Sequence, residues 1–401
     1  MQVKSSPIPA SSRLNRPPAV LPSFDFSPLN RVLFGSGALA RLGEVARELG
    51  GKHVLLVTDP GLEAAGHPQR ALGYLQAAGM EVSVFDEVRE NPTTTQVEAG
   101  AKFAHDHHID LIVGIGGGSS MDCAKGLNFV LTNGGHMTDY KGFGKAAKPM
   151  LPSIGIPTTA GTGSEAQSYA LITDEQTHIK MACGDKKAAF RVAILDPELT
   201  LSQPKAVTAV TGIDALAHAV ESYVCTKRNP LSQAFALAAW RHMEPNLETV
   251  LRDPADLEAR AAMQIGSHLA GAAIENSMLG ICHSCANPLT AHYGITHGIA
   301  IGILLPHVVR FNAPAVNSLY AELVEQAGLA NGDTLFAPEA LAQRLSELMR
   351  VAGLPTTLSE CGIGDGILPV LAEEANQQWT ARFNPRPVTE AELLRLYEAA
   401  F

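Results

Sequence analysis

The sequence predicts an α/β domain followed by an all-α domain. Up to about Pro204, short β-branched segments such as 53–58 and 81–85 alternate with helical stretches such as 97–107. This alternation is typical of a mostly parallel sheet covered by helices. The last convincing strand is 191–197, and segments rich in Ala, Leu and Glu follow it. We expect helices over residues 207–223, 232–250, 257–279, 299–311, 338–351 and 390–400.

The predicted organisation divides the 401 residues into three parts. Residues 1–27 are rich in Pro and Ser, and we expect them to form a flexible extension. Residues 28–204 form the α/β domain and residues 205–401 form the helical domain. This length gives ample core for two or three domains.

Composition excludes several classes of protein. The 30 basic residues against 40 acidic ones give a net charge of −10, which argues against nucleic acid as a partner. We find no apolar run of the roughly 18 residues that a membrane span needs and no signal peptide, so we expect a cytoplasmic protein without a membrane contact. Six scattered cysteines do not suggest a disulfide framework. Cys282 and Cys285 are spaced as a redox or zinc pair would be, but no second pair completes a zinc knuckle, which favours small buried thiols.

A first glycine-rich loop follows the apolar segment 110–115 and opens into a helical stretch. Glycines let the backbone approach a pyrophosphate closely, and the free N–H groups at a helix start favour an anion. The loop departs from the G-x-G-x-x-G pattern because Ser119 holds the third glycine position. The alternative is a tight turn without a ligand. The candidate cofactor-binding residues here are Gly116, Gly117, Gly118, Ser119 and Asp122.

A second loop, residues 156–166, is also rich in small residues that could bind a phosphate. Its glycines and hydroxyl side chains offer N–H and O–H donors to a phosphate or a ribose. The alternative is a solvated Ser/Thr/Gly loop. The candidate cofactor-binding residues here are Thr158, Thr159 and Thr162.

Four residues have types and spacing that suit one divalent metal ion. Asp214 and His218 are four residues apart, so they share one face of a predicted helix. His283 and His297 come later in the helical domain. Three imidazoles and one carboxylate make a mixed nitrogen and oxygen set, which suits Fe²⁺ or Zn²⁺. The alternative for each histidine taken alone is a surface or core residue, since the chain has 14 of them.

The two loops and the four residues together resemble the iron-containing (group III) alcohol dehydrogenase family. The similarity runs from about Asn30 to the C-terminus. It rests on these segments: 116–119, 157–165, Gly212 to Ala215 with His218, His283, His297 with Gly298, 303–308 and 384–387.

This resemblance implies a fold, a site and a cofactor. The α/β domain is expected to bind a dinucleotide, and the metal is expected in the cleft between the domains. Asp59 follows the first strand, at a position that bears on cofactor choice in the family. Its carboxylate can accept from a ribose 2′-OH and repels a 2′-phosphate, so it favours NAD over NADP; a turn cap beside Pro60 is the alternative. Lys180 matches a family lysine that contacts the cofactor.

The function implied is an NAD-dependent, divalent-metal-dependent alcohol dehydrogenase or aldehyde reductase, with a small alcohol or aldehyde as partner and a homodimer or larger homo-oligomer. The alternatives are a hydroxyacid–oxoacid transhydrogenase of the same family and a non-catalytic metal-binding relative. Maleylacetate reductases do without metal, so the intact quartet argues against them. Asn287 stands where many members have a second histidine, and an amide cannot act as a general acid or base near neutral pH. Proton transfer would then use the ribose, water or another group such as His292.

Overall fold

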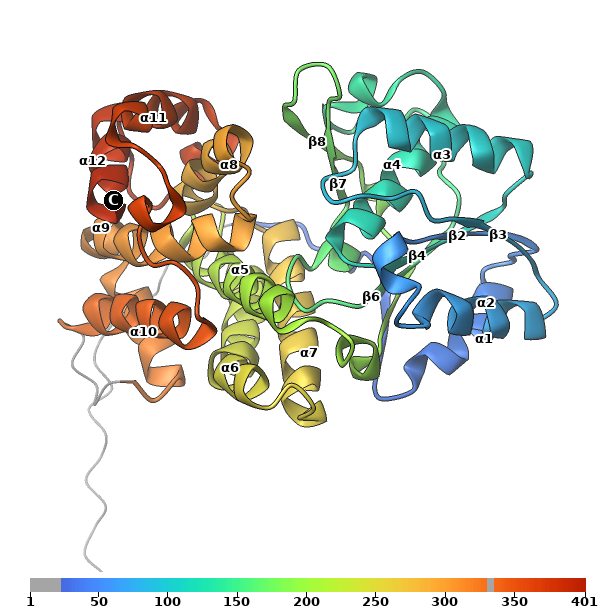
Figure 1. The fold of residues 1–401 in the computed structure, drawn as a ribbon, viewed down its shortest axis with the longest axis horizontal. Coiled ribbons are helices and arrows are strands. Elements are labelled where there is room, and N and C mark those ends of the chain that lie inside the picture. Colours follow the sequence, from blue (N-terminus) through green and yellow to red (C-terminus); the bar gives the residue numbers. More distant parts are fainter. Residues whose placement is uncertain (1–22, 330–334) are drawn as a thin grey trace, which may run out of the picture.

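A computed structural model describes residues 23–329 and 335–401 of the chain. Its two halves lie side by side, one built on strands with helices around them and the other built of helices (Figure 1). The fold class predicted from the sequence is therefore confirmed. Of the predicted extension 1–27, residues 1–22 lie outside the described residues, and residues 23–30 have no regular secondary structure.

Six parallel strands of the described chain form the main sheet, in the order β1-β9-β6-β4-β2-β3. The strands are β1 (Arg31–Phe34), β2 (His53–Val57), β3 (Glu81–Phe85), β4 (Leu111–Gly116), β6 (Ser153–Pro157) and β9 (Val192–Leu195). Helices α1 (Leu42–Glu48) and α2 (His67–Ala77) pack on one face of this sheet. Helices α3 (Thr94–Asp106) and α4 (Gly118–Asn133) pack on the other. With both faces covered, β4 is buried along its whole length, which explains its continuous apolar sequence.

The strand order reverses between β2 and β4, which lie next to each other. From β2 the chain moves outward to β3, then returns to β4 on the other side of β2, and β6 and β9 follow in that direction. In open α/β sheets, ligands bind outside the carboxyl ends of the strands at such a reversal. Asp59 after β2 and the glycine loop after β4 both lie at this place.

A second, small sheet was not predicted from the sequence. It contains β5 (Gly142–Phe143), β7 (Tyr169–Thr173) and β8 (Lys180–Gly184), in the order β5-β8-β7. β7 and β8 are antiparallel, and β5 is parallel to β8. This sheet meets the helical half, because the ring of Tyr169 stacks on that of Trp379 with centroids 6.2 Å apart.

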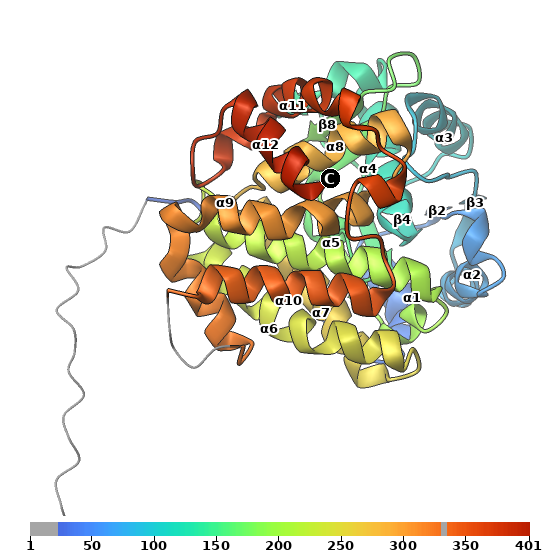
Figure 2. The same ribbon diagram turned by 60° about the vertical axis from the view of Figure 1, so that its left-hand side comes forward.

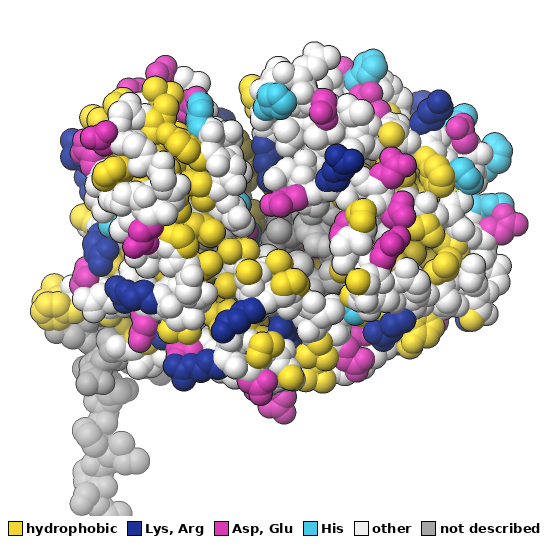
Figure 3. All heavy atoms as spheres, in the orientation of Figure 1, with side chains coloured by type: hydrophobic (Ala, Val, Ile, Leu, Met, Phe, Trp, Pro, Cys, Tyr) yellow, Lys and Arg dark blue, Asp and Glu magenta, His cyan; other side chains and the backbone are white. Residues whose placement is uncertain are grey.

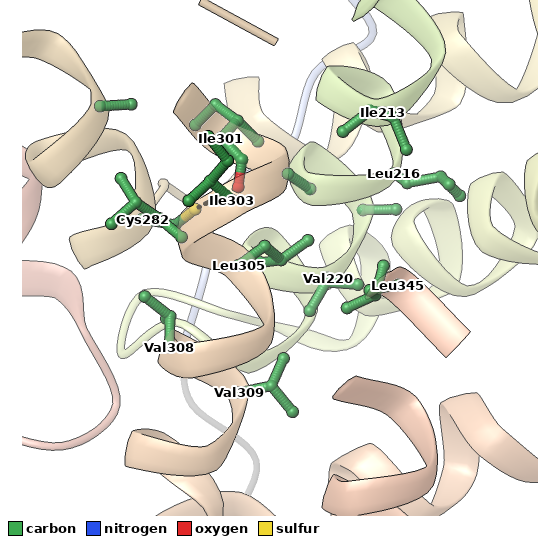
Figure 4. Packing of buried hydrophobic residues seen from close by; sticks show 14 of the residues in the cluster. Ile213, Leu216, Val220, Cys282, Ile301, Ile303, Leu305, Val308, Val309 and Leu345 are labelled. Carbon is green, nitrogen blue, oxygen red and sulfur yellow. Dashed lines mark hydrogen bonds between the residues drawn. The ribbon is translucent and has the colours of Figure 1, made fainter. Parts of the chain in front are cut away.

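The helical half surrounds α5, which packs against α6, α7 and α9 (Figure 2). The helices are α5 (Lys205–Val224), α6 (Pro230–Arg252), α7 (Leu257–Glu275), α8 (Ile281–Tyr293), α9 (His297–Gln326), α10 (Ala337–Ala352), α11 (Leu368–Gln377) and α12 (Glu390–Ala400). Apolar side chains of α5 such as Leu216 and Val220 lie among Leu305 of α9 and Leu345 of α10 (Figure 4). Helix α5 is therefore fixed in position by packing against helices on several sides.

Helix α9 corrects one expectation from the sequence. Among the described residues it is the one helix long and apolar enough to span a membrane by length and composition, whereas the sequence predicted no such segment. Of its most apolar window, 61% is buried inside the fold. The apolar character of α9 is thus accounted for by packing against α5, α8 and α10.

Candidate functional site

The carboxylate of Asp59 contacts the start of α4 at the strand reversal. Its Oδ2 accepts a hydrogen bond from the Ser120 hydroxyl at 3.0 Å. Asp59 precedes a short 3₁₀ turn but makes no side-chain capping bond to it, so the alternative reading as a turn cap is not supported. Gly116 has φ +149°, and a Cβ there would lie 2.3 Å from Ser120 Oγ and 3.0 Å from Asp59 Oδ2. Only glycine allows this close approach.

The next two glycines face the second loop. A Cβ on Gly118 would lie 2.7 Å from Thr162 Cγ2, whereas a Cβ on Gly117 would lie 3.5 Å from Thr159 Cγ2. The Thr158 N–H donates to the Gly116 carbonyl at 2.9 Å, so the two loops are joined. Gly117 precedes α4 without a side-chain cap, which leaves the first N–H groups of that helix free of a side-chain partner. The two predicted loops thus meet at a helix start suited to an anion.

Ser119 and Lys180 meet at a common partner. The Asn91 N–H donates to Ser119 Oγ at 3.3 Å, and Lys180 Nζ donates to Asn91 Oδ1 at 3.1 Å. Burial lowers the pKa of His297, and the positive charges of His283 and Lys180 lower it further. Lys180 is therefore joined to the glycine loop through Asn91 and acts electrostatically on His297.

Asp122 lies in a buried polar network. Its Oδ1 accepts from the Ser164 hydroxyl at 2.6 Å and lies 3.3 Å from the ammonium of Lys125, whose side chain is 1% exposed. Lys125 also donates to the Ser164 and Tyr169 carbonyls. The sequence did not single out Lys125. Asp122 therefore stabilises the buried contacts of Ser164 and Lys125, and its binding to a cofactor stays a prediction.

The second loop is also fixed to the helical half through α7. Gln264 Nε2 donates to the Pro157 carbonyl at 3.2 Å, and His268 Nδ1 lies 3.1 Å from Glu165 Oε1. Glu275 accepts from both the hydroxyl and the N–H of Ser168, at 2.7 and 2.9 Å. These residues of α7 follow each other at intervals of four and seven, so they share one face. We call this face the α7 seam.

The four predicted metal ligands converge in the helical half. Asp214 and His218 lie on α5, His283 lies in the first turn of α8, and His297 is the first residue of α9. The Nε2 atoms of His218 and His283 lie 3.5 Å from Asp214 Oδ1, and that of His297 lies 3.8 Å from it. The ligand atoms of Asp214, His283 and His297 are all within 4.8 Å of one another. The ring of His218 stacks on that of His283, with centroids 4.9 Å apart.

Glycine brings these elements together. A Cβ on Gly298, next to His297, would lie 2.0 Å from the Val210 carbonyl oxygen, so only glycine lets α9 start against α5. A Cβ on Gly161 of the second loop would lie 2.5 Å from the Cβ of Thr211, one turn before Asp214. The loop and the ligands are therefore neighbours on α5. Figure 3 shows the surface hollowed between the two halves.

The donor set fits a divalent cation. Asp214 Oδ1 and His283 Nε2 are buried and face each other, yet neither has a hydrogen-bond partner. Burial would raise the pKa of Asp214, but the neighbouring histidines hold it well below its usual range. Burial lowers the pKa of His218, as it does that of His297, which favours the neutral imidazole that metals bind. A cation placed among these atoms would satisfy groups that otherwise lack a partner.

Glu221 is a part of this site that the sequence analysis missed. It lies on α5, three residues after His218 and seven after Asp214, on the same helical face. Its Oε2 lies 2.5 Å from His283 Nδ1. Burial alone would lower the pKa of His283, but the carboxylates of Asp214 and Glu221 raise it to about 9. The i, i+4, i+7 spacing on α5 was the available signal.

Asn287, at the position of the family's second histidine, and His292, the candidate for proton transfer, each have a side-chain partner. The Asn287 amide donates to Gln378 Oε1 at 3.1 Å. His292 Nε2 lies 2.9 Å from both carboxylate oxygens of Glu374, at the surface. It follows His283 by nine residues on α8, about 13 Å along the helix axis. His292 is thus not an immediate neighbour of the ligands. Cys282 and Cys285, which flank His283, are both buried free thiols, as expected.

The similarity of the chain to known proteins agrees with this geometry. Residues 29–197 match the model of the family "Iron-containing alcohol dehydrogenase", and residues 208–401 match that of the "Fe-containing alcohol dehydrogenase family, C-terminal". The chain belongs to the iron-containing alcohol dehydrogenase family. The resemblance stated from its motifs is therefore confirmed.

Relatives within this family are similar over almost their whole length. The 1,3-propanediol dehydrogenase of Klebsiella pneumoniae is 37% identical, over 94% of this chain and 99% of the relative. The NAD-dependent methanol dehydrogenase of Bacillus methanolicus is 35% identical, over 92% and 97%. A crystal structure of a 1,3-propanediol oxidoreductase superposes with a TM-score of 0.92 and 37% identity, over 95% of this chain and 100% of that one.

Proposed function

We propose that the protein is an NAD-dependent alcohol dehydrogenase that works with a divalent metal ion, and an aldehyde reductase in the reverse direction. The observation that carries this is the pair of unpartnered buried atoms, Asp214 Oδ1 and His283 Nε2, with two more imidazoles directed at the same carboxylate. Membership of the iron-containing alcohol dehydrogenase family supports it.

The chain's own residues would divide the work between the two halves. The helix start after Gly117, with Asp59 beside it, would hold the pyrophosphate and the ribose of NAD. Asp214 and the three histidines would hold the metal, which supplies a Lewis acid that polarises a carbonyl or stabilises an alkoxide. Asn287 holds no titratable proton, so the alcohol proton would leave through water or the cofactor ribose.

The finer assignments are also proposals. The mixed nitrogen and oxygen donor set suits Fe²⁺, with Zn²⁺ as the second candidate. A small primary alcohol or diol is the proposed substrate, because the relatives named above act on 1,3-propanediol and methanol. The carboxylate of Asp59 supports NAD over NADP.

The test is NADH formation from a panel of alcohols with NAD or NADP, using chelator-treated enzyme reloaded with Fe²⁺ or Zn²⁺. Metal-dependent NADH formation is the expected result. A transhydrogenase would instead move hydride from a hydroxy acid to an oxo acid without net NADH. A non-catalytic relative would bind metal and NADH without turnover. Full activity in the metal-free enzyme would refute the proposal.

We propose that the protein is a cytoplasmic homodimer or larger homo-oligomer. β1 is an edge strand of the main sheet, and its residues Val32 and Phe34 are 38% and 48% exposed, which supports a homodimer or larger homo-oligomer. Light scattering after size exclusion tests this, and a monomer at micromolar concentration would contradict it. Six free thiols support the cytoplasm as the location, which cell fractionation tests.

A further inference from the structure

Glu221 is a buried carboxylate that uses both of its oxygens at one place. The residue lies on α5 and is only 3% exposed, so its carboxylate is not solvated by bulk water. Oε1 accepts from the Cys282 N–H at 2.8 Å, and Oε2 lies 2.5 Å from His283 Nδ1. Both partners belong to the first turn of α8. One carboxylate therefore holds the start of that helix and the predicted ligand on it.

Helix α8 depends on this carboxylate for its N-terminal cap. The helix is preceded by Gly280, which makes no side-chain capping bond, so its first N–H groups need a partner from elsewhere. Glu221 supplies an acceptor and a negative charge there, both favourable at a helix N-terminus. A Cβ on Gly280 would lie 2.9 Å from Glu221 Oε1, so the glycine leaves room for the carboxylate.

The same contact fixes which ring nitrogen of His283 is free. An ionised carboxylate only accepts, so Nδ1 must carry the hydrogen. The lone pair of neutral His283 is then on Nε2, the atom that lies 3.5 Å from Asp214 Oδ1 without a hydrogen-bond partner. A hydrogen-bonded carboxylate behind a ligating histidine sets its tautomer and raises its basicity.

Glu221 also completes a charge balance. A divalent ion among the neutral imidazoles would carry +2, and Asp214 offsets one unit of it. Glu221, behind His283, supplies the second negative charge within the same buried cluster. A buried charge needs such compensation, because the low dielectric of the interior makes an uncompensated one costly.

We propose that Glu221 is a positioning residue for the metal, which sets the tautomer of His283, holds the first turn of α8 and neutralises the divalent ion. This inference rests on the proposed function. It differs from the ligand assignment in that Glu221 contacts the back of a ligand, His283 Nδ1, and would act on the metal through that ring.

The test compares Glu221→Gln with Glu244→Gln for zinc affinity, measured by competition with a chromogenic chelator. Glutamine keeps the size but replaces one of the two carboxylate oxygens by an NH₂ group, so an acceptor can face the Cys282 N–H or His283 Nδ1 but not both. We expect the zinc affinity of Glu221→Gln to fall about 10- to 100-fold. Glu244 is a matched control: it is a buried glutamate of α6, 3% exposed, and accepts from Arg344 Nε at 2.6 Å. Its variant should bind zinc as the wild type does.

A second variant keeps the inference testable if Glu221→Gln does not fold. In Gly280→Ala the new Cβ meets Glu221 Oε1, so the carboxylate must shift, and zinc affinity should fall without any change of charge. The absorption of the Co²⁺-loaded protein should change in both variants, because the ring of His283 is reoriented. Unchanged zinc affinity in whichever of these variants folds would overturn the inference. A wild type that binds no zinc or cobalt would instead overturn the proposed function.

Discussion

The replacement Asp214→Ala separates a metal ligand from a structural carboxylate. As a ligand, Asp214 supplies the one negative charge among the four donors, and Nε2 atoms of three histidines lie 3.5 to 3.8 Å from its Oδ1. Removing it should strip the metal and abolish alcohol oxidation. NADH binding should be nearly intact, because Asp59 and the glycine loop lie in the other half.

The magnitude follows from mass action. Free zinc at about 100 times its Kd stabilises the wild type by about 2.7 kcal/mol. With an unfolding entropy of roughly 2.1 cal/mol/K per residue over the 401 residues that melt together, each kcal/mol shifts the Tm by about 1.2 °C, so zinc should raise the wild-type Tm by about 3 °C. In Asp214→Ala at the same zinc concentration this rise should vanish. Differential scanning fluorimetry of chelated and reloaded protein measures it, with metal content checked by mass spectrometry.

Asp256→Ala is the control for a structural aspartate. The Asp256 side chain caps α7 and accepts from the Ala259 N–H at 2.9 Å. Its loss should cost about 1 kcal/mol with or without zinc, but leave the zinc-induced rise intact. If Asp214→Ala behaves like this control, with metal retained and stability reduced, the ligand assignment is wrong.

Three further predictions address the cofactor and pH. Gly117→Ala should weaken NADH binding with an unchanged Tm, because the new Cβ is only in van der Waals contact with Thr159. Gly118→Ala should also lower the Tm, because its Cβ clashes with Thr162. Equal losses of Tm in the two variants, measured by thermal melting, would contradict this prediction. Asp59→Gly should raise kcat/KM for NADP by removing repulsion of the 2′-phosphate; a wild type that already prefers NADP would contradict it. The pKa of metal-free His283 is raised from 6.5 to about 9, so zinc must displace a proton below that pH. Zinc affinity measured by calorimetry should rise about tenfold per pH unit from about pH 7 and level off near 9; a flat profile would refute the proton competition.

The sequence predicted those parts of the fold that are determined locally. The helix predicted over 390–400 is observed as α12, Glu390–Ala400, with Thr389 and Glu392 forming a capping box. Strand β3 also has its predicted bounds. The helix predicted over 257–279 ends at Glu275 instead, and the one predicted over 299–311 continues to Gln326, past Pro314 and a kink at Val316.

What the sequence did not predict depends on distant partners. Strand β5 has two residues, Gly142 and Phe143, and exists through its pairing with β8. Helix α8 contains Pro288 and has no capping side chain of its own, so its start depends on Glu221, 61 residues before Cys282. Glu221 shares the face of α5 that carries Asp214 and His218, but its task depends on a contact with His283, 62 residues away, which the spacing on α5 alone does not predict.

The α7 seam bears on how the molecule unfolds. Glu165, Ser168 and the carbonyl of Pro157 belong to the half built on strands, but their partners Gln264, His268 and Glu275 belong to α7. Cutting the chain after Pro204 would expose these groups to water and exchange their mutual hydrogen bonds for bonds to solvent, a loss of about 0.5–1.5 kcal/mol each. Although the chain passes from one half to the other near Pro204, the two halves should melt in a single cooperative transition. Residues 1–204 produced alone should be unstable, so nucleotide binding cannot be studied by simple dissection.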